Sequence, residues 1–237
     1  MKRYLQTLIE IIRIKFSPMA YKNSLVRLYE ERMLETSLAY AMEHFKRCVY
    51  FHDKKQLWDY TVTQIAEAQE HNNSGDLYLE FGTWKGASIN YFSDRLKQTT
   101  FYGFDSFQGL QEDWKGANQA KGGFNLDGKL PKVNKNVVLV SGWFDVTLPQ
   151  FLSEKKGNIP FVHIDCDTYE ATKIVLDNIY PRLAKNAYIL FDEYIGYPGW
   201  KEGEYKAFQE MVVAHKIGYE YVAFCDLQVL VRIKSDL

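Results

Sequence analysis

Carboxylates gather at the ends of several predicted β-strands, where they could bind a cation or accept a proton. Each lies at or just after the end of a short, β-rich run. The carboxyl ends of parallel strands meet along one edge of a sheet, and ligands bind there. Like charges crowded along such an edge are unfavourable unless a cation or hydrogen-bond donors offset them. We therefore expect one shared ligand site that contains Glu80, Asp105, Asp165, Asp167, Asp192 and Glu193.

The segments HIDCD and FDEY carry the acids best suited to a metal ion. Asp165, Asp192 and Glu193 offer carboxylate oxygens, which suit Mg²⁺, Ca²⁺ or Mn²⁺ better than Zn²⁺. His163 lies two residues back along the same strand, so we interpret it as a satisfied core histidine. Asp167 could be a metal ligand, a substrate contact or a helix cap, and the YEAT that follows favours the cap.

The stretch YLEFGTWKGAS, residues 78–88, has the pattern of a strand, a glycine turn and the start of a helix. Gly82 and Gly86 would let the backbone approach a ligand closely, and the free N–H groups of the new helix would face that ligand. The GxGxxG spacing is missing, and Trp84 would obstruct a pyrophosphate. A dinucleotide is therefore disfavoured.

Two further residues suit a nucleoside without phosphates. Asp105 ends the second predicted strand, where an acid can accept both hydroxyls of a ribose. Its separation from Glu80 is close to the roughly 20 residues typical of such units. Trp143 ends the third strand and could stack on an adenine, although a role as a core aromatic residue is the alternative.

Short β-rich runs alternate with helical runs from Asp76 onward. This alternation predicts an α/β fold with a mainly parallel, doubly wound, Rossmann-like sheet that is covered on both faces. The last two runs are closely spaced around Leu227, which predicts a C-terminal antiparallel hairpin. We expect about seven strands, in a domain that covers residues 72–237.

Residues 1–71 are predicted to form an N-terminal helical extension without a strand, because apolar residues recur three and four positions apart. Exposed apolar helices there suggest a homodimer. Charges interrupt residues 1–16 and no small-residue cleavage site follows, so we expect a helix packed on the core or on a partner subunit rather than a signal peptide. Peripheral membrane contact is the alternative. Residues 109–136 are too long for a plain connection, and we expect a substrate lid.

The composition disfavours several classes of partner. The formal net charge is −1 and the Lys and Arg residues are scattered, so we expect no nucleic acid partner. No run of about 18 apolar residues occurs, so we expect no transmembrane segment. The chain has 3 cysteines and no CxxC pair, which fits a reducing, cytoplasmic setting.

A series of motifs, in order along roughly residues 75–235, resembles the macrocin O-methyltransferase family. They are EFGTWKGAS, GFDSFQGL, SGWFDVTLP, HIDCDTYEAT, PRL, FDEY and YPGWKEGEYKAF. The resemblance implies a class I methyltransferase that uses S-adenosylmethionine, in a family of which many members methylate hydroxyls on the sugars of natural products.

The resemblance also implies which residues hold the cofactor. Glu80 and Gly82 would bind the methionine end of S-adenosylmethionine, and Asp105 would bind its ribose. Ser106 and Trp143 would flank the adenine. The other implied cofactor contacts are Trp84, Gly86, Ser88, Gly142 and Asp165.

The metal ligands implied by the resemblance are Asp165, Asp192 and Glu193, for Mg²⁺ or another divalent cation. Asp165 also matches the residue proposed as the base in that family. The family usually has Asp at the position of Glu193, and the extra methylene shifts the carboxylate by about one bond length.

From the resemblance we expect a Mg-dependent O-methyltransferase that acts on a hydroxyl of a sugar or another small polyhydroxylated natural product. Asp165 would accept the hydroxyl proton, and the lid would exclude water. Two alternatives stay open. One is a different acceptor, such as a catechol-like or lipid-linked hydroxyl, and the other is a non-catalytic cofactor-binding module.

Overall fold

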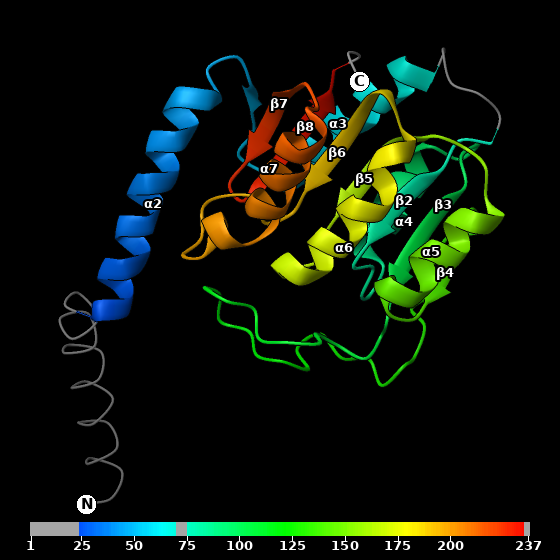
Figure 1. The fold of residues 1–237 in the computed structure, drawn as a ribbon, viewed down its shortest axis with the longest axis horizontal. Coiled ribbons are helices and arrows are strands. Elements are labelled where there is room, and N and C mark those ends of the chain that lie inside the picture. Colours follow the sequence, from blue (N-terminus) through cyan, green and yellow to red (C-terminus); the bar gives the residue numbers. More distant parts are fainter. Residues whose placement is uncertain (1–23, 70–74, 235–237) are drawn as a thin grey trace, which may run out of the picture.

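A computed structural model describes residues 24–69 and 75–234. Its centre is an 8-stranded sheet in the order β1-β7-β8-β6-β5-β2-β3-β4 (Figure 1). The pairs are parallel except those of β8 with β6 and with β7. The predicted fold class and terminal hairpin are confirmed. The strands are β1 (Val49–Tyr50), β2 (Tyr78–Phe81), β3 (Phe101–Asp105), β4 (Val137–Ser141), β5 (Ile159–Ile164), β6 (Leu183–Phe191), β7 (Tyr219–Cys225) and β8 (Gln228–Ile233).

Helices cover both faces of the sheet. One face packs against α3 and α4 through Leu57 and Phe92, and the other packs against α5, α6 and α7 through residues such as Phe151, Leu176 and Phe208. The helices are α2 (Leu25–His44), α3 (Lys54–Gln69), α4 (Ala87–Arg95), α5 (Phe144–Glu154), α6 (Tyr169–Ile179) and α7 (Glu204–His215), with the short 3₁₀ helices η1 (Tyr180–Arg182) and η2 (Trp200–Glu202).

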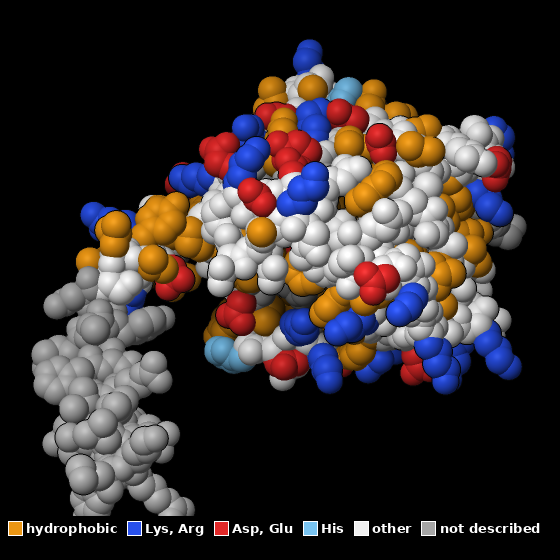
Figure 2. Space-filling view, turned by 90° about the horizontal axis from the view of Figure 1, so that it is seen from below, with side chains coloured by type: hydrophobic (Ala, Val, Ile, Leu, Met, Phe, Trp, Pro, Cys, Tyr) orange, Lys and Arg blue, Asp and Glu red, His pale blue; other side chains and the backbone are white. Residues whose placement is uncertain are grey.

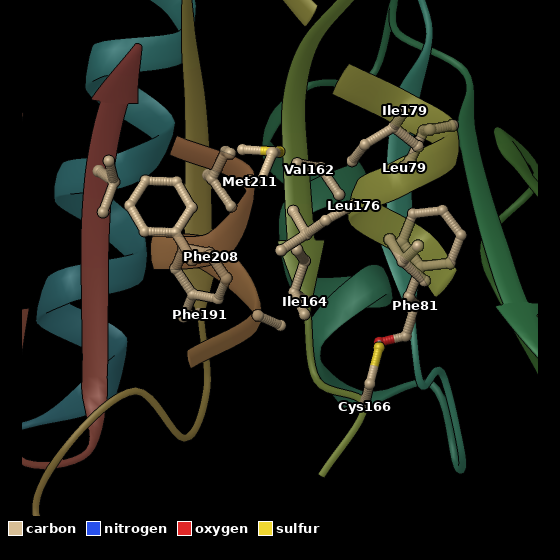
Figure 3. Close-up of a cluster of buried hydrophobic side chains, with 14 of the residues drawn as sticks. Leu79, Phe81, Val162, Ile164, Cys166, Leu176, Ile179, Phe191, Phe208 and Met211 are labelled. Carbon is tan, nitrogen blue, oxygen red and sulfur yellow. The ribbon is translucent and has the colours of Figure 1, made fainter. Parts of the chain in front are cut away.

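Successive side chains of a strand point to opposite faces of the sheet, so each strand contributes to both layers of the core. In β6, Tyr188 and Leu190 belong to the layer under α3 and α4, whereas Ile189 faces the opposite layer. All residues of β2 and β5 are buried, as expected for central parallel strands. Figure 3 shows Ile164 of β5 and Phe191 of β6 within the apolar layer between the sheet and the helices. The strand ends that carry the acids therefore rise from the best-packed part of the molecule.

One prediction about the N-terminal region is wrong. Val49–Tyr50 forms the edge strand β1, paired in parallel with β7, where no strand was expected. A two-residue strand leaves no periodic signal, and its pairing partner lies far away in the sequence. The described part of the predicted helical extension contains α2, which ends at His44, and α3. The helix expected over residues 1–16 lies outside the described residues.

Residues 109–136 form an irregular, folded loop rather than a helix or a strand. A single bridge joins Trp114 to Gln119, and Leu110 and Gly123 hydrogen bond across the loop. The loop passes below the carboxyl ends of the strands in Figure 1. Among the described residues, no helix combines the length and apolarity needed to cross a membrane.

Candidate functional site

The site lies where the strand order of the sheet reverses. The chain runs outward from β2 to β3 and β4, then crosses to β5, which pairs with the other side of β2. Such a switch point opens a crevice at the carboxyl ends of the strands. A cavity of about 320 Å³ lies there. Its walls include ten of the residues predicted from the sequence, namely Gly82, Trp84, Ser88, Asp105, Ser106, Trp143, Asp165, Asp167, Asp192 and Glu193.

Three predicted residues are near the cavity without lining it. Glu80 is buried within β2, where 1% of its surface is exposed. Gly86 has a φ of 77° and caps the start of α4. Gly142 follows β4 with a φ of 140°. Gly86 and Gly142 are chain neighbours of the lining residues Ala87 and Trp143.

Gly82 joins the first turn of the site to the strand that carries Asp165. Its φ is +90°, and a Cβ at this position would lie 2.7 Å from the carbonyl carbon of Asp165. Only glycine fits such an approach without strain. The glycine of the opening motif therefore brings two loops of the protein together, in addition to leaving room for a ligand.

Asp105 is held by two backbone donors. Trp84 N–H donates to Oδ2 over 2.7 Å, and Phe107 N–H donates to Oδ1 over 2.6 Å. Burial raises the pKa of Asp105, and these two bonds oppose that effect. Each carboxylate oxygen keeps a second lone pair, so the group is fixed in place and can still accept from a ligand hydroxyl.

His163 connects two acids of the site. Its Nδ1 lies 3.0 Å from Glu80 Oε2, and its Nε2 lies 3.8 Å from Asp192 Oδ1. Burial lowers the pKa of His163, but the two carboxylates outweigh it and raise the pKa to about 10. The ring is fully buried, as predicted. Its role extends beyond that of a core residue, because it is a cation between the two acids.

Asp192 has further support from the C-terminal hairpin. The side-chain amide of Gln228 donates to Asp192 Oδ1, and Trp58 Nε1 donates to Gln228 Oε1 over 3.1 Å. Burial raises the pKa of Asp192, but hydrogen bonding and charge from His163 lower it to about 2. Asp192 is therefore ionised throughout the physiological pH range. Neither Gln228 nor Trp58 was identified from the sequence.

The acids form two overlapping groups that share Asp165. Ligand atoms of Asp165, Asp192 and His163 lie within 4.8 Å of one another, and so do those of Asp165, Asp167 and Glu193. The buried Glu193 Oε2 has no hydrogen-bond partner. An unpaired carboxylate oxygen among hard oxygen donors fits a divalent cation. The consecutive residues Asp192 and Glu193 fall in different groups, so the predicted set of three ligands is divided.

Crowding of these acids makes several of them hold protons more tightly. Burial and the charge of Asp192 raise the pKa of Asp165 well above its ordinary value. The same two causes raise the pKa of Glu193 and raise that of Asp167 to about 7. A cation would relieve this repulsion.

The favoured interpretation of Asp167 as a helix cap is wrong. The cap of α6 is Thr168, whose side chain accepts a hydrogen bond from Ala171 N–H. Asp167 instead has a φ of 63° and joins the acid group with Asp165 and Glu193. Asp tolerates the left-handed backbone conformation better than most residues. Here that conformation turns the Asp167 carboxylate toward the site.

Trp84 and the loop 109–136 meet at the cavity wall. The Trp84 ring is 38% exposed and contacts the Phe124 ring edge-on, with centroids 5.4 Å apart. Lys115 pairs with Glu170 of α6 over 3.1 Å. Leu110, Glu112 and Trp114 also line the cavity. The loop therefore forms part of the site.

Comparison with known proteins shows which proteins this chain resembles. Residues 79–194 match the family model for a methyltransferase domain. The chain is 27% identical over 177 residues to demethyldecarbamoylnovobiocin O-methyltransferase of Streptomyces niveus, covering 62% of this chain and 64% of that protein. It is 28% identical over 144 residues to mycinamicin III 3''-O-methyltransferase of Micromonospora griseorubida, covering 51% and 55%. The chain thus spans less than two thirds of the length of these curated relatives.

Solved structures share the fold. The calicheamicin methyltransferase CalS11 superposes with a TM-score of 0.59 at 22% identity, covering 76% of this chain and 80% of that one. The O-methyltransferase NovP gives a TM-score of 0.56 at 21% identity, covering 74% and 78%. An O-methyltransferase from Bacillus cereus in complex with SAH gives a TM-score of 0.50 at 14% identity, covering 87% and 90%.

Proposed function

We propose that this chain, which carries a methyltransferase domain over residues 79–194, is an S-adenosylmethionine-dependent O-methyltransferase. Its acceptor is a hydroxyl of a sugar or another small polyhydroxylated natural product, as in the macrocin O-methyltransferase family. One observation carries the proposal: the glycine turn, Asp105 and the acids led by Asp165 line a single cavity at the switch point of the sheet. The relatives named for novobiocin and mycinamicin support a natural-product acceptor.

Roles for the cofactor side follow from the positions of the side chains. Asp105, already fixed by two backbone donors, accepts the hydroxyls of the ribose. Trp143 and Ser106 flank the adenine from the ends of β4 and β3, and both line the cavity. Glu80 supports the methionine end from within β2. The cofactor supplies a methyl group that its sulfonium makes electrophilic.

On the acceptor side the acids position and deprotonate a hydroxyl. A divalent cation, which we assign as Mg²⁺, would be held by Asp165, which belongs to both groups, with Asp167 and Glu193 of one group and Asp192 of the other. Bound there, it would lower the pKa of the acceptor hydroxyl. Asp165 lines the cavity at the end of β5 and accepts the proton, directly or through a water. Alignment of the two reactants contributes on the order of 7–11 kcal/mol.

The surrounding elements complete the proposal. Residues 109–136 act as the lid over the acceptor, anchored by Lys115 on α6. The described part of the N-terminal extension predicted for residues 1–71 contributes to the domain predicted at 72–237, because β1 joins its sheet and α3 covers one face of that sheet. The cysteines Cys48, Cys166 and Cys225 are free thiols, which supports a reducing, cytoplasmic setting.

Calorimetry with S-adenosylhomocysteine, with and without Mg²⁺, tests the function. We expect micromolar binding, turnover of an acceptor hydroxyl, and loss of turnover with a chelator. Asp105→Ala should weaken binding of S-adenosylhomocysteine, and Asp165→Asn should abolish turnover with binding retained. Tight cofactor binding without any response to metal would favour a metal-free transferase or a binding module. Failure to bind the cofactor would refute the proposal.

A homodimer through α2 is a further part of the proposal. Leu34, Leu38 and Met42 are exposed by 54%, 61% and 68%, and their spacing of four residues places them on one stripe of the helix. Figure 2 shows apolar side chains along the helix where it projects from the body. A second copy of the same stripe would cover it. Light scattering should report a dimer that Leu34→Lys with Leu38→Lys dissociates and that Glu43→Lys, an exposed residue on the opposite side of the helix, leaves intact. A monomeric parent would exclude the dimer.

A further inference from the structure

Glu204 is a buried carboxylate next to the acid groups, and it does not line the cavity. It is the first residue of α7, and none of its surface is exposed. Its Oε1 accepts from Cys166 N–H over 3.4 Å, and its Oε2 accepts from Glu193 N–H over 3.1 Å. Burying a carboxylate is costly unless hydrogen bonds offset the lost hydration. Here the two bonds that do so come from outside its own helix.

The two donors belong to residues that directly follow proposed metal ligands. Cys166 follows Asp165, and Glu193 follows Asp192. The ladder between β5 and β6 ends just before them, at the bond from Asp192 N–H to Ile164 O of 2.9 Å. Beyond that point no strand pairing holds the two turns at a fixed separation. The Glu204 carboxylate spans them both.

A glutamate in the first turn of a helix commonly stabilises that helix through its dipole. That role needs no contact with other segments, and an exposed acid such as Glu202 could serve it. Both oxygens of Glu204 are instead committed to the turns after β5 and β6. Since one rigid group accepts from both turns, a change in its shape or number of acceptors alters their spacing.

We propose that Glu204 is a positioning residue that sets the separation between Asp165 and the pair Asp192–Glu193. The inference rests on the proposed function, because those acids are its proposed cation ligands. Glu204 lies behind them and touches neither cofactor nor acceptor. Among the described residues no hydrogen bond joins Glu204 to Glu80 or Asp105, whose partners are His163, Trp84 and Phe107, so the cofactor side should not depend on it.

Magnesium affinity is the measurement that isolates this role. Mg²⁺ is titrated by calorimetry into the full chain saturated with S-adenosylhomocysteine, for the parent, Glu204→Gln and Glu204→Leu. The matched control is Glu202→Gln, because Glu202 is exposed and pairs only with Lys206 over 3.2 Å. Loss of groups behind metal ligands typically costs about 10–100-fold in affinity. We expect at least a tenfold loss in Glu204→Gln, a larger one in Glu204→Leu, and unchanged S-adenosylhomocysteine affinity.

Backbone NMR gives a second readout that does not depend on metal. The amide protons of Cys166 and Glu193 should move upfield in Glu204→Gln, because an amide group is a weaker acceptor than a carboxylate. The control Glu202→Gln should leave them in place. This measurement also keeps the test valid if Glu204→Leu fails to fold.

Three results would overturn the inference. Magnesium affinity in Glu204→Gln equal to that of the control would show that the residue does not position the acids. A parallel loss of magnesium and S-adenosylhomocysteine affinity would indicate a general structural role. Absence of magnesium binding in the parent and control alike would remove the ligands to be positioned, and it would identify the proposed function as the failing premise.

Discussion

Substitution of Gly82 by alanine tests how closely the ends of β2 and β5 must approach. The added Cβ would lie 2.7 Å from the Asp165 carbonyl carbon and closer still to its oxygen. Carbon atoms in contact are normally about 3.5–4.0 Å apart, and the contact with the oxygen is shorter still, so the two loops must separate by more than about 1 Å. Both atoms belong to the backbone and cannot rotate away. Overpacking of this kind costs about 1–3 kcal/mol, and the positive φ adds about 1–2 kcal/mol.

Gly128 provides the matched control. Its φ is +71°, and a Cβ there would meet nothing within 4 Å. Gly128→Ala should therefore show the backbone cost alone, about 1–2 kcal/mol. Gly82→Ala should lose about 1–3 kcal/mol more.

Urea unfolding followed by tryptophan fluorescence measures both free energies of unfolding. Calorimetry on the folded fraction should also show weaker S-adenosylhomocysteine binding in Gly82→Ala and unchanged binding in Gly128→Ala. If the two free energies agree within about 0.5 kcal/mol, the usual scatter between independent sites, the close approach has no energetic importance and our account of the turn is refuted.

Two other predictions concern charge at the site. His163→Leu leaves Glu80 and Asp192 without their cation and should lower the free energy of unfolding by about 3–5 kcal/mol, as measured with urea. The double variant of His163→Leu with Glu80→Leu should lose less than the sum of the two single losses. Strict additivity of the losses would argue against the ion pair. The pKa of Asp167 is raised to about 7, so its contribution to stability is complete below its ordinary value and is lost as the pH rises through about 7. In EDTA, Asp167→Asn should gain stability over the parent between about pH 5 and about pH 8, and a constant difference across that range would contradict the assignment.

The sequence was informative where local periodicity determines structure. The alternation of strands and helices predicted the sheet, and the rule that ligands bind at strand ends found Asp105, Asp165 and Asp192. Both depend on residues close together in the chain. The edge strand β1 was not predicted, because its two residues pair with the distant strand β7 and show no periodicity of their own.

Contacts between distant segments explain the other omissions. His163 is the register partner of Glu80 across β2 and β5, and that register could not be read from either strand alone. Gln228 reaches Asp192 from the hairpin, and Glu204 reaches the same edge from α7. The cap of α6 was misplaced by one residue. That small error favoured the wrong one of the three roles considered for Asp167, which belongs to the acid group.

Charge at this edge links the stability of the fold to its proposed chemistry. The fold holds Asp165, Asp167 and Glu193 together, while His163 directly contacts Glu80 and Asp192 and offsets the charge of Asp165 only in part. The uncompensated acids must take up protons or a cation, as their raised pKa values indicate. A ligand that binds only the folded state stabilises it. Magnesium should therefore raise the thermal midpoint of the parent more at about pH 8 than at about pH 5, where protons compete for the same oxygens. An equal rise at both pH values would mean that the cation binds elsewhere.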